Sequence, residues 1–283
     1  MFNFAGRNLK IYFRQKSAVF FSLLGVFIII GLYVVFLGDV WVTGFELPDK
    51  EILMYSWIIA GIVSVSSITT VMGAFGSMVE DRERKNSKDF FSSPVKRSQI
   101  VGGYLLSAYV IGVFMSILAL FLGEIYIVAN GGVLLSFDSM LRALFVILLS
   151  SAASSSFVFF IVSFFKSNNA FTTASTILGT LIGFLTGIYL PIGSLPEYVQ
   201  WLIKLFPVSH GAALMRQIMM EVPIQTSFAD APLDILLQFK ETLGITYTYG
   251  STTASMAVHL LVLAGTAVLF FLLALCNVSR ENK

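Results

Sequence analysis

Six long apolar runs, separated by shorter polar stretches, dominate the pattern of the chain. An α-helix rises about 1.5 Å per residue, so about 20 apolar residues cross the roughly 30 Å hydrocarbon core of a bilayer. A backbone in lipid must satisfy its own hydrogen bonds, which favours helices over isolated strands. The pattern therefore predicts an all-α membrane protein with six transmembrane helices. They cover residues 18–38, 54–79, 103–129, 141–165, 170–190 and 255–278.

Residues 1–17 predict an interfacial helix before the first span. On a helical wheel at about 100° per residue, apolar and basic side chains fall on opposite sides. The apolar side holds Phe2, Ala5, Leu9, Tyr12 and Phe13, and the basic side holds Arg7, Lys10 and Arg14. We expect the basic side to face lipid phosphates at the membrane surface. A positively charged flank without a defined helix is the alternative.

Composition supports a membrane protein, and the positions of the cations give it an orientation. Hydrophobic residues make up 57% of the 283 residues and charged residues only 12%, against about 25% in a typical soluble domain. Of the 18 Lys and Arg residues, 13 lie in the N-terminal segment, the second and fourth loops and the C-terminal tail. The positive-inside rule places these parts in the cytoplasm. We expect a multi-pass protein of the cytoplasmic membrane with both termini cytoplasmic.

Signatures of enzymes and cofactors are missing from the sequence. The chain has no Gly-x-x-x-x-Gly-Lys-Ser/Thr motif to hold nucleotide phosphates, no His-Glu-x-x-His pair and no cluster of cysteines or histidines. The net charge of +2 is dispersed, which argues against a nucleic-acid partner. Cys276 is the single cysteine, so an intrachain disulfide is excluded. We expect no enzyme activity, metal or cofactor in this chain, and another polypeptide must hydrolyse any ATP.

The segment 80–99 carries the densest cluster of charges and lies between the second and third predicted spans. It mixes four acids with six cations and adds Phe90 and Phe91. Mixed charges at i,i+3 and i,i+4 suit a short solvated helix, and exposed Phe suits contact with another protein. Pro94 would end this helix. We interpret the segment as a docking element for a cytoplasmic partner.

After the fifth predicted span, residues 191–254 predict short helices on the external side. Pro191 ends the span, and apolar residues recur at helical spacing between Pro196 and Pro207. A helix of about ten residues covers only about 15 Å, too short to cross the bilayer. A re-entrant hairpin in the outer leaflet and a small lid on the membrane surface both fit this pattern. Gly244 would end a further external helix.

The charged segment resembles the loop after the second transmembrane helix of type-2 ATP-binding-cassette (ABC) permeases. The family pattern is acidic and basic residues, Gly-Thr, a hydrophobic pair, Ser-Pro, a basic residue and a later Gly. This chain has Asn86 and Ser87 in place of Gly-Thr. The matching residues are Glu80, Arg82, Glu83, Phe90, Phe91, Ser93, Pro94, Val95, Arg97 and Gly103.

In the family this segment is the coupling helix, which sits in a groove of the ATPase subunit. The resemblance therefore implies ATPase contact for a set of charged and aromatic residues and a proline. They are Asp81, Arg82, Glu83, Arg84, Asp89, Phe90, Phe91 and Pro94.

The segment 185–220 is similar to the family's sequence after the fifth span. That sequence holds Gly, Pro, Leu-Pro, an amphipathic helix, Asn-Pro and a distal Arg, and Phe206 replaces the Asn here. The matching residues are Gly187, Pro191, Leu195, Pro196, Trp201, Pro207, His210 and Arg216. The two motifs, the spans and the N-terminal helix make the resemblance cover nearly the whole chain. It implies that residues 1–283 form one type-2 ABC transmembrane domain with an external re-entrant hairpin.

Gly179, Gly183 and Gly187 lie at four-residue spacing, which would place them on one face of the fifth span. Such glycines let two helices approach closely. Packing within one subunit and packing between subunits both fit the spacing. In the family the fifth span lies near the dimer seam, so the resemblance implies a dimer interface here.

Ionisable side chains within spans are costly unless they are paired or hydrated. Glu124 and Arg142 begin or end neighbouring spans at a similar outer level, where they could pair. An interhelical tie and a cation-recognising site are both open interpretations of Glu124. We expect His259 in the last span and His210 near the hairpin to be packing residues, with a proton relay at His259 as the alternative.

The resemblance implies the permease subunit of an ATP-driven exporter. It would work as a homodimer or a heterodimer with two copies of a separate ATPase subunit, which would hold ATP and Mg²⁺. An apolar path rich in Phe and Met suits amphipathic or lipophilic cargo such as drugs, lipid-like molecules, toxins or hydrophobic peptides. Membrane lipids are expected partners. A secondary transporter and a non-transporting membrane scaffold or sensor are the alternatives.

Overall fold

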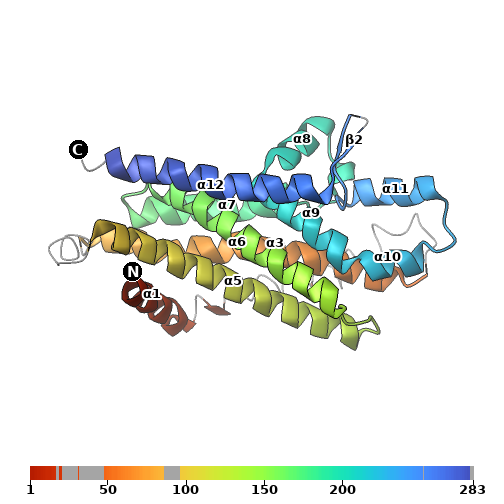
Figure 1. Ribbon diagram of the computed structural model, residues 1–283, viewed down its shortest axis with the longest axis horizontal. Helices are drawn as coiled ribbons and strands as arrows, with labels where there is room; N and C mark the ends of the chain where they lie inside the picture. The colour runs from red at the N-terminus through yellow and green to blue at the C-terminus, as the bar shows by residue number, and fades with distance from the viewer. Residues whose placement is uncertain (17–18, 21–30, 32–47, 86–95, 251, 281–283) are drawn as a thin grey trace.

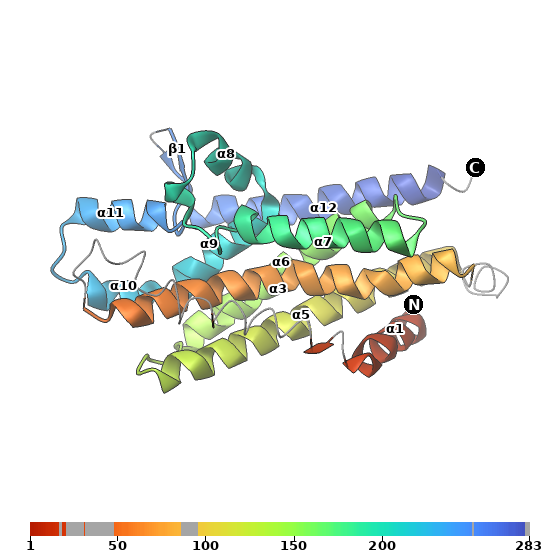
Figure 2. The ribbon, with the colours of Figure 1, turned by 180° about the vertical axis from the view of Figure 1, so that it is seen from behind.

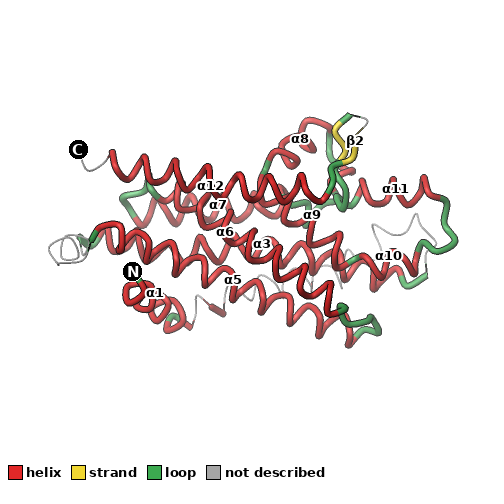
Figure 3. Tube along the Cα trace, viewed as in Figure 1, coloured by secondary structure: helices red, strands yellow, loops and turns green. Residues whose placement is uncertain are grey.

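Helices make up nearly all the regular structure of this protein (Figures 1 and 3). The computed structural model describes residues 1–16, 19–20, 31, 48–85, 96–250 and 252–280. The main α-helices in these ranges are α1 (Phe2–Arg14), α3 (Lys50–Glu83), α5 (Arg97–Ala129), α6 (Phe137–Val162), α7 (Asn168–Leu185), α8 (Glu197–Leu205), α9 (Pro207–Met219), α10 (Glu221–Ser227), α11 (Leu233–Thr242) and α12 (Met256–Arg280). The other elements are a 3₁₀-helix, η2 (Ile192–Ser194), and the antiparallel strands β1 (Thr248–Tyr249) and β2 (Thr252–Thr253).

Four of the described helices, α3, α5, α6 and α12, are long and apolar enough to cross a membrane. They overlap the predicted spans 54–79, 103–129, 141–165 and 255–278. α3 is longer than its predicted span at both ends. The predicted span 18–38 lies almost wholly outside the described residues.

The predicted fifth span, 170–190, is wrong in its extent. α7 has 18 residues, begins with two asparagines and carries several Thr and Ser, and it is not among the four apolar helices. It ends in a Schellman motif, in which the amide of Ile188 donates to the carbonyl of Gly183 at 3.0 Å. Gly187 adopts the left-handed conformation that this motif requires, with φ +66°. The apolar run continues past this glycine, but the helix does not.

The long helices lie side by side along the longest axis of the molecule (Figures 1 and 2). α3 packs against α5, α6, α7 and α9 and is mostly buried, whereas α12 is mostly exposed. One end of the bundle holds α1, the end of α3, the start of α5 and the end of α12. α10, α11 and the turn between α5 and α6 lie at the other end. This arrangement agrees with the predicted grouping of both termini and the charged segment on one side.

The helices after α7 differ in how they meet the bundle. α8 fills the interval between Pro196 and Pro207, and α9 begins at Pro207. α8 projects from the bundle, whereas α9 is almost wholly buried against α3, α6 and α12. α9 is therefore part of the bundle core and no surface lid, and re-entry into a bilayer stays a prediction. Gly244 has φ +66° and follows the end of α11, as the sequence predicts.

Small residues let α3 and α5 pack closely at the centre of this bundle. A Cβ atom at Gly112 of α5 would lie 2.6 Å from the side chain of Val71 in α3. A Cβ atom at Gly123 would clash with the side chain of Ile59. Glycine at these two turns of α5 therefore leaves the space that side chains of α3 fill.

Candidate functional site

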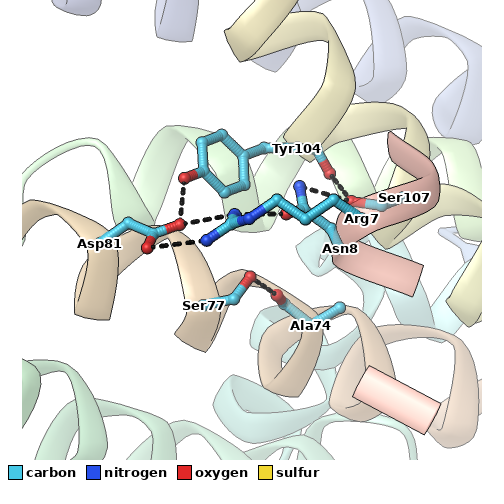
Figure 4. A network of polar contacts seen from close by, with 7 residues as sticks. All are labelled: Arg7, Asn8, Ala74, Ser77, Asp81, Tyr104 and Ser107. Atoms are coloured by element: carbon cyan, nitrogen blue, oxygen red, sulfur yellow. Dashed lines mark hydrogen bonds and ion pairs between the residues drawn. The ribbon is translucent and has the colours of Figure 1, made fainter. Parts of the chain in front are cut away.

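The last turn of α3 carries a buried acid that joins three helices. Asp81 is 6% exposed and lies between α1 and α5 (Figure 4). Its carboxylate accepts hydrogen bonds of 2.9 and 3.1 Å from the guanidinium of Arg7 in α1. It also accepts a bond of 2.6 Å from the hydroxyl of Tyr104 in α5. A bidentate Arg–carboxylate pair fixes orientation as well as distance, so Asp81 holds α1 and α5 to the end of α3.

Close packing of α1 on α5 brings Arg7 to this position. Gly103 makes room for Phe4, because a Cβ atom at residue 103 would lie 2.8 Å from the Phe4 ring. The Phe4 ring meets the Tyr104 ring edge-on, with 5.0 Å between their centroids. The Arg7 guanidinium lies 5.4 Å from the centroid of the Phe4 ring. The aromatic pair thus supports the cation from one side.

The polar network extends along α1 by one residue. Arg7 donates to Asn8 Oδ1 at 3.0 Å, and Asn8 Nδ2 donates to the hydroxyl of Ser107 at 3.4 Å. Hydrogen bonding to Asp81 raises the pKa of Arg7 above its usual value, because the carboxylate stabilises the charged guanidinium.

The predicted amphipathic helix at the N-terminus is present as α1, but the predicted orientation of Arg7 toward lipid phosphates is wrong. It turns inward to Asp81, whereas Lys10 is exposed.

The two residues after Asp81 connect α3 to the turn between α6 and α7. Arg82 Nη1 donates to the carbonyls of Val162 and Phe165, both at 3.3 Å. A cation is favourable there because the last carbonyls of a helix carry partial negative charge. Glu83 Oε1 accepts a hydrogen bond of 3.2 Å from the amide of Asn168, the first residue of α7. An anion is favourable there because the free amides at the start of a helix carry partial positive charge.

The structure therefore gives internal partners to the first part of the predicted docking element. The sequence predicts a separate solvated helix from residue 81 onward, whereas α3 continues to Glu83 and Asp81 is buried. The charges at its end face other helices because α1 and the α6–α7 turn pack around it. The side chain of Arg84 remains 69% exposed and, among the described residues, pairs along its own helix with Glu80 at 2.7 Å. Contact with an ATPase stays a prediction for Asp81, Arg82, Glu83 and Arg84, and Asp89, Phe90, Phe91 and Pro94 lie outside the described residues.

A buried cation lies at the second predicted motif. Arg216 of α9 is fully buried, and its Nη2 donates to the carbonyls of Thr186 and Gly187, both at 3.0 Å. These carbonyls follow the last turn of α7. The Arg216 guanidinium also lies over the ring of Trp57 in α3, 4.9 Å from its centroid. Arg216 thus joins α9, α7 and α3 inside the bundle.

The other hairpin residues shape the ends of short elements. Pro191 precedes η2, Pro196 precedes α8, and Pro207 is the first residue of α9. Trp201 is half exposed on α8, where its ring packs edge-on against Tyr249 of β1 with 5.8 Å between centroids. None of these side chains lies near a charged cluster that could perform chemistry in the described part of the chain.

His210 and His259 form a buried pair that connects α9 to α12. Their Nδ1 atoms lie 2.9 Å apart, and His210 Nε2 lies 2.9 Å from the carbonyl of Lys204. A carbonyl only accepts, so His210 carries its proton on Nε2 and His259 donates from Nδ1 when both rings are neutral. Tyr247 packs on both rings, with centroids 5.5 and 5.3 Å away. Both histidines are thus buried and hydrogen-bonded, and their packing role stays a prediction.

The predicted pair between Glu124 and Arg142 is wrong. Arg142 pairs instead with Asp138 at 2.9 Å, one turn earlier in α6, and with Glu221 at 2.7 Å, which ties α6 to α10. Glu124 Oε2 accepts a bond of 3.0 Å from the amide of Leu135 in the turn after α5. Glu124 faces this turn, and α10 supplies the acid that reaches Arg142.

The three predicted interface glycines do not form one helical ridge. Apart from the nearby backbone of α7, no heavy atom of the described residues lies within 4 Å of a Cβ built at Gly179. Gly183 packs against the ring of Tyr189 from its own chain, and Gly187 lies beyond the end of α7. The close packing of Gly183 and Gly187 is therefore within one chain. A dimer interface stays a prediction, with the open side of α7 at Gly179 as its remaining support.

The sequence analysis missed the partners of the buried charges. Tyr104 and Ser107 lie three residues apart in an apolar helix, so the sequence does place two polar groups on one face. Trp57 and Glu221 carry no comparable signal, because their contacts are long-range. Among the described residues, no group of three or more His, Cys, Asp or Glu side chains is arranged to hold a metal ion.

Comparison with known proteins gives one family. The model of a family described as ABC-2 family transporter protein matches residues 42–276. The match includes the end of α3, the buried Arg216 and most of the helical bundle. A search of curated proteins finds no match to this chain.

Proposed function

The chain belongs to the ABC-2 family of transporter proteins, and on this premise we propose that it is the permease subunit of an ATP-driven exporter. As a member of this family it is a membrane transport subunit and not itself a catalyst. We expect it to work with two copies of an ABC ATPase subunit, which hold ATP and Mg²⁺. A second permease, identical or paralogous, completes the transporter. Family membership favours this function over a secondary transporter or a membrane scaffold.

The contacts of three consecutive residues at the end of α3 carry the proposal. Asp81 binds α1 and α5, Arg82 binds the end of α6, and Glu83 binds the start of α7. A partner that pushes on the segment after Glu83 would therefore move several helices together. We propose that the ATPase docks on the segment from Arg84 to residue 99, and that the internal contacts transmit its motion.

The cargo path would run between two permeases. The chain is rich in Phe and Met, which suits amphipathic or lipophilic cargo, such as drugs, lipid-like molecules, toxins or hydrophobic peptides. The burial of α9 among candidate spanning helices supports a hairpin that re-enters the outer leaflet. The end of the bundle with α1 and both termini would then lie at the cytoplasmic side of the cell membrane, with residues 1–283 as one transmembrane domain.

Reversing exposed charge at the end of α3 is expected to release the ATPase. Arg84 and Lys85 are exposed, and replacing both by glutamate should lower the affinity of the ATPase by about tenfold or more through like-charge repulsion at the contact. The measurement is the vanadate-sensitive ATPase activity that co-purifies with the tagged permease from its native membrane. The chain has no nucleotide-binding motif, so this activity must come from a partner.

The matched control reverses two cations away from the end of α3, one on the projecting helix α8 and one on α11. Lys204→Glu with Lys240→Glu changes the net charge equally, and the co-purified activity should then equal that of the wild type. Equal loss of activity in both double variants would contradict docking at the end of α3. Wild-type permease that purifies intact without any ATPase activity would contradict the proposed function itself.

A further inference from the structure

A buried acid, Glu124, is part of the wall of an apolar groove formed by α5, α6 and the turn between them. Glu124 is 3% exposed, and it is the one polar side chain among the described residues that line this groove of about 700 Å³. This volume falls in the range of about 300–1,000 Å³ that small-molecule sites occupy. The apolar lining includes Ile117, Phe121, Ile125, Val128, Met140 and Leu144.

The charge of Glu124 has no counter-ion in the described part of the chain. Its carboxylate accepts one hydrogen bond, from the amide of Leu135. The cation at the same end of the bundle, Arg142, is already bound by Asp138 and Glu221. A carboxylate in apolar surroundings is costly unless a cation or a proton compensates its charge. The groove therefore combines space for an apolar body with a site for positive charge.

The kind of cation follows from the ligands that surround the carboxylate. A metal ion such as Mg²⁺ or Ca²⁺ needs about six oxygen ligands, and the other residues lining the groove are apolar. An organic cation needs one counter-charge and an apolar surface. Phe121 is 62% exposed and Ile125 is 52% exposed along the same side of α5. The groove is thus open on an apolar helix face, which suits a ligand that arrives from the hydrocarbon of a membrane.

We propose that this groove binds a lipophilic organic cation, with its charge against Glu124 and its apolar body along α5 and α6. The statement that this ligand is a cargo rests on the proposed export function, whereas binding itself requires no ATPase. A cationic ligand supplies the counter-charge that Glu124 lacks among the described residues, whereas an anion would be repelled.

Binding of tetraphenylphosphonium to the purified full chain in lipid nanodiscs tests the proposal. We expect saturable binding to the wild type above the partitioning into empty nanodiscs. Glu124→Gln keeps an acceptor for the Leu135 amide but removes the charge, and it should weaken binding by about tenfold or more. Leu144→Trp keeps the charge but fills the groove, so it should weaken binding as well.

Two matched controls separate charge recognition from apolar partitioning. Tetraphenylborate has the same shape and the opposite charge, and it should not bind saturably. Glu51→Gln removes an exposed acid that does not line the groove, and binding should then be unchanged. Three results would each overturn the proposal. They are unaltered binding by Glu124→Gln and Leu144→Trp, binding of the borate equal to that of the phosphonium, and no saturable binding by the wild type. A permease that binds the cation but recruits no ATPase would contradict the export function and leave the groove site standing.

Discussion

Arg216→Met is expected to lower the free energy of unfolding by about 3–5 kcal/mol, because it leaves buried carbonyls without their donor. Arg216 is fully buried and donates to the carbonyls of Thr186 and Gly187 at the end of α7. It also stacks on Trp57 of α3, so methionine loses the contact between cation and ring. The measurement is the free energy of unfolding of the purified permease in detergent micelles, obtained from thermal and chemical denaturation.

The control for this prediction is a cation that serves one carbonyl near the surface. Lys204 donates to the carbonyl of Thr248 at 2.9 Å on the projecting part of the fold. Lys204→Met should therefore lower the free energy of unfolding by only about 1 kcal/mol. Arg216→Lys should fall between the two, because one ammonium cannot reproduce the planar guanidinium geometry. An Arg216→Met variant as stable as Lys204→Met would show that the buried contacts add nothing.

The fold was predictable where a long run of apolar residues continued with few charged residues. α3, α5, α6 and α12 overlap four of the predicted spans and are long and apolar enough to cross a membrane. A run of about 20 apolar residues favours a helix, because a backbone in lipid must satisfy its own hydrogen bonds. The end of α7 was not predictable from the apolar run, since Gly187 has two possible roles. At four-residue spacing from Gly183 it fits a helical ridge, but its φ of +66° makes it the residue that ends the helix.

The partners of the charged residues were the least predictable part of the site. Periodicity assigns a residue to a face of its own helix, but it does not say which element packs there. The sequence places Glu124 and Arg142 at similar depths in neighbouring spans, which predicts that they pair. In the structure Arg142 pairs with Glu221 of α10 instead. The charged run predicts a solvated Asp81, whereas the structure buries it between α1 and α5.

Asp81→Asn is expected to lower the free energy of unfolding by about 2–3 kcal/mol, because it removes the buried negative charge that binds the guanidinium of Arg7. Arg7→Gln combined with Asp81→Asn should cost less than the sum of the two single changes, with a coupling energy of about 1–2 kcal/mol. The exposed pair of Glu80 and Arg84, at 2.7 Å, is the control. Its double-mutant cycle should give only about 0.3–0.5 kcal/mol. Denaturation of the four variants of each cycle measures both values.

The same Asp81→Asn variant separates transmission of motion from docking of the ATPase. Asp81 contacts α1 and α5 from a buried position, so its change should leave the co-purified ATPase activity equal to that of the wild type. ATP-driven transport into inside-out vesicles should nevertheless fall severalfold, because α1 and α5 would no longer follow the end of α3. Loss of the ATPase together with transport would instead place Asp81 in the docking surface. Full transport would show that the Arg7–Asp81 pair holds the fold and plays no part in transmission.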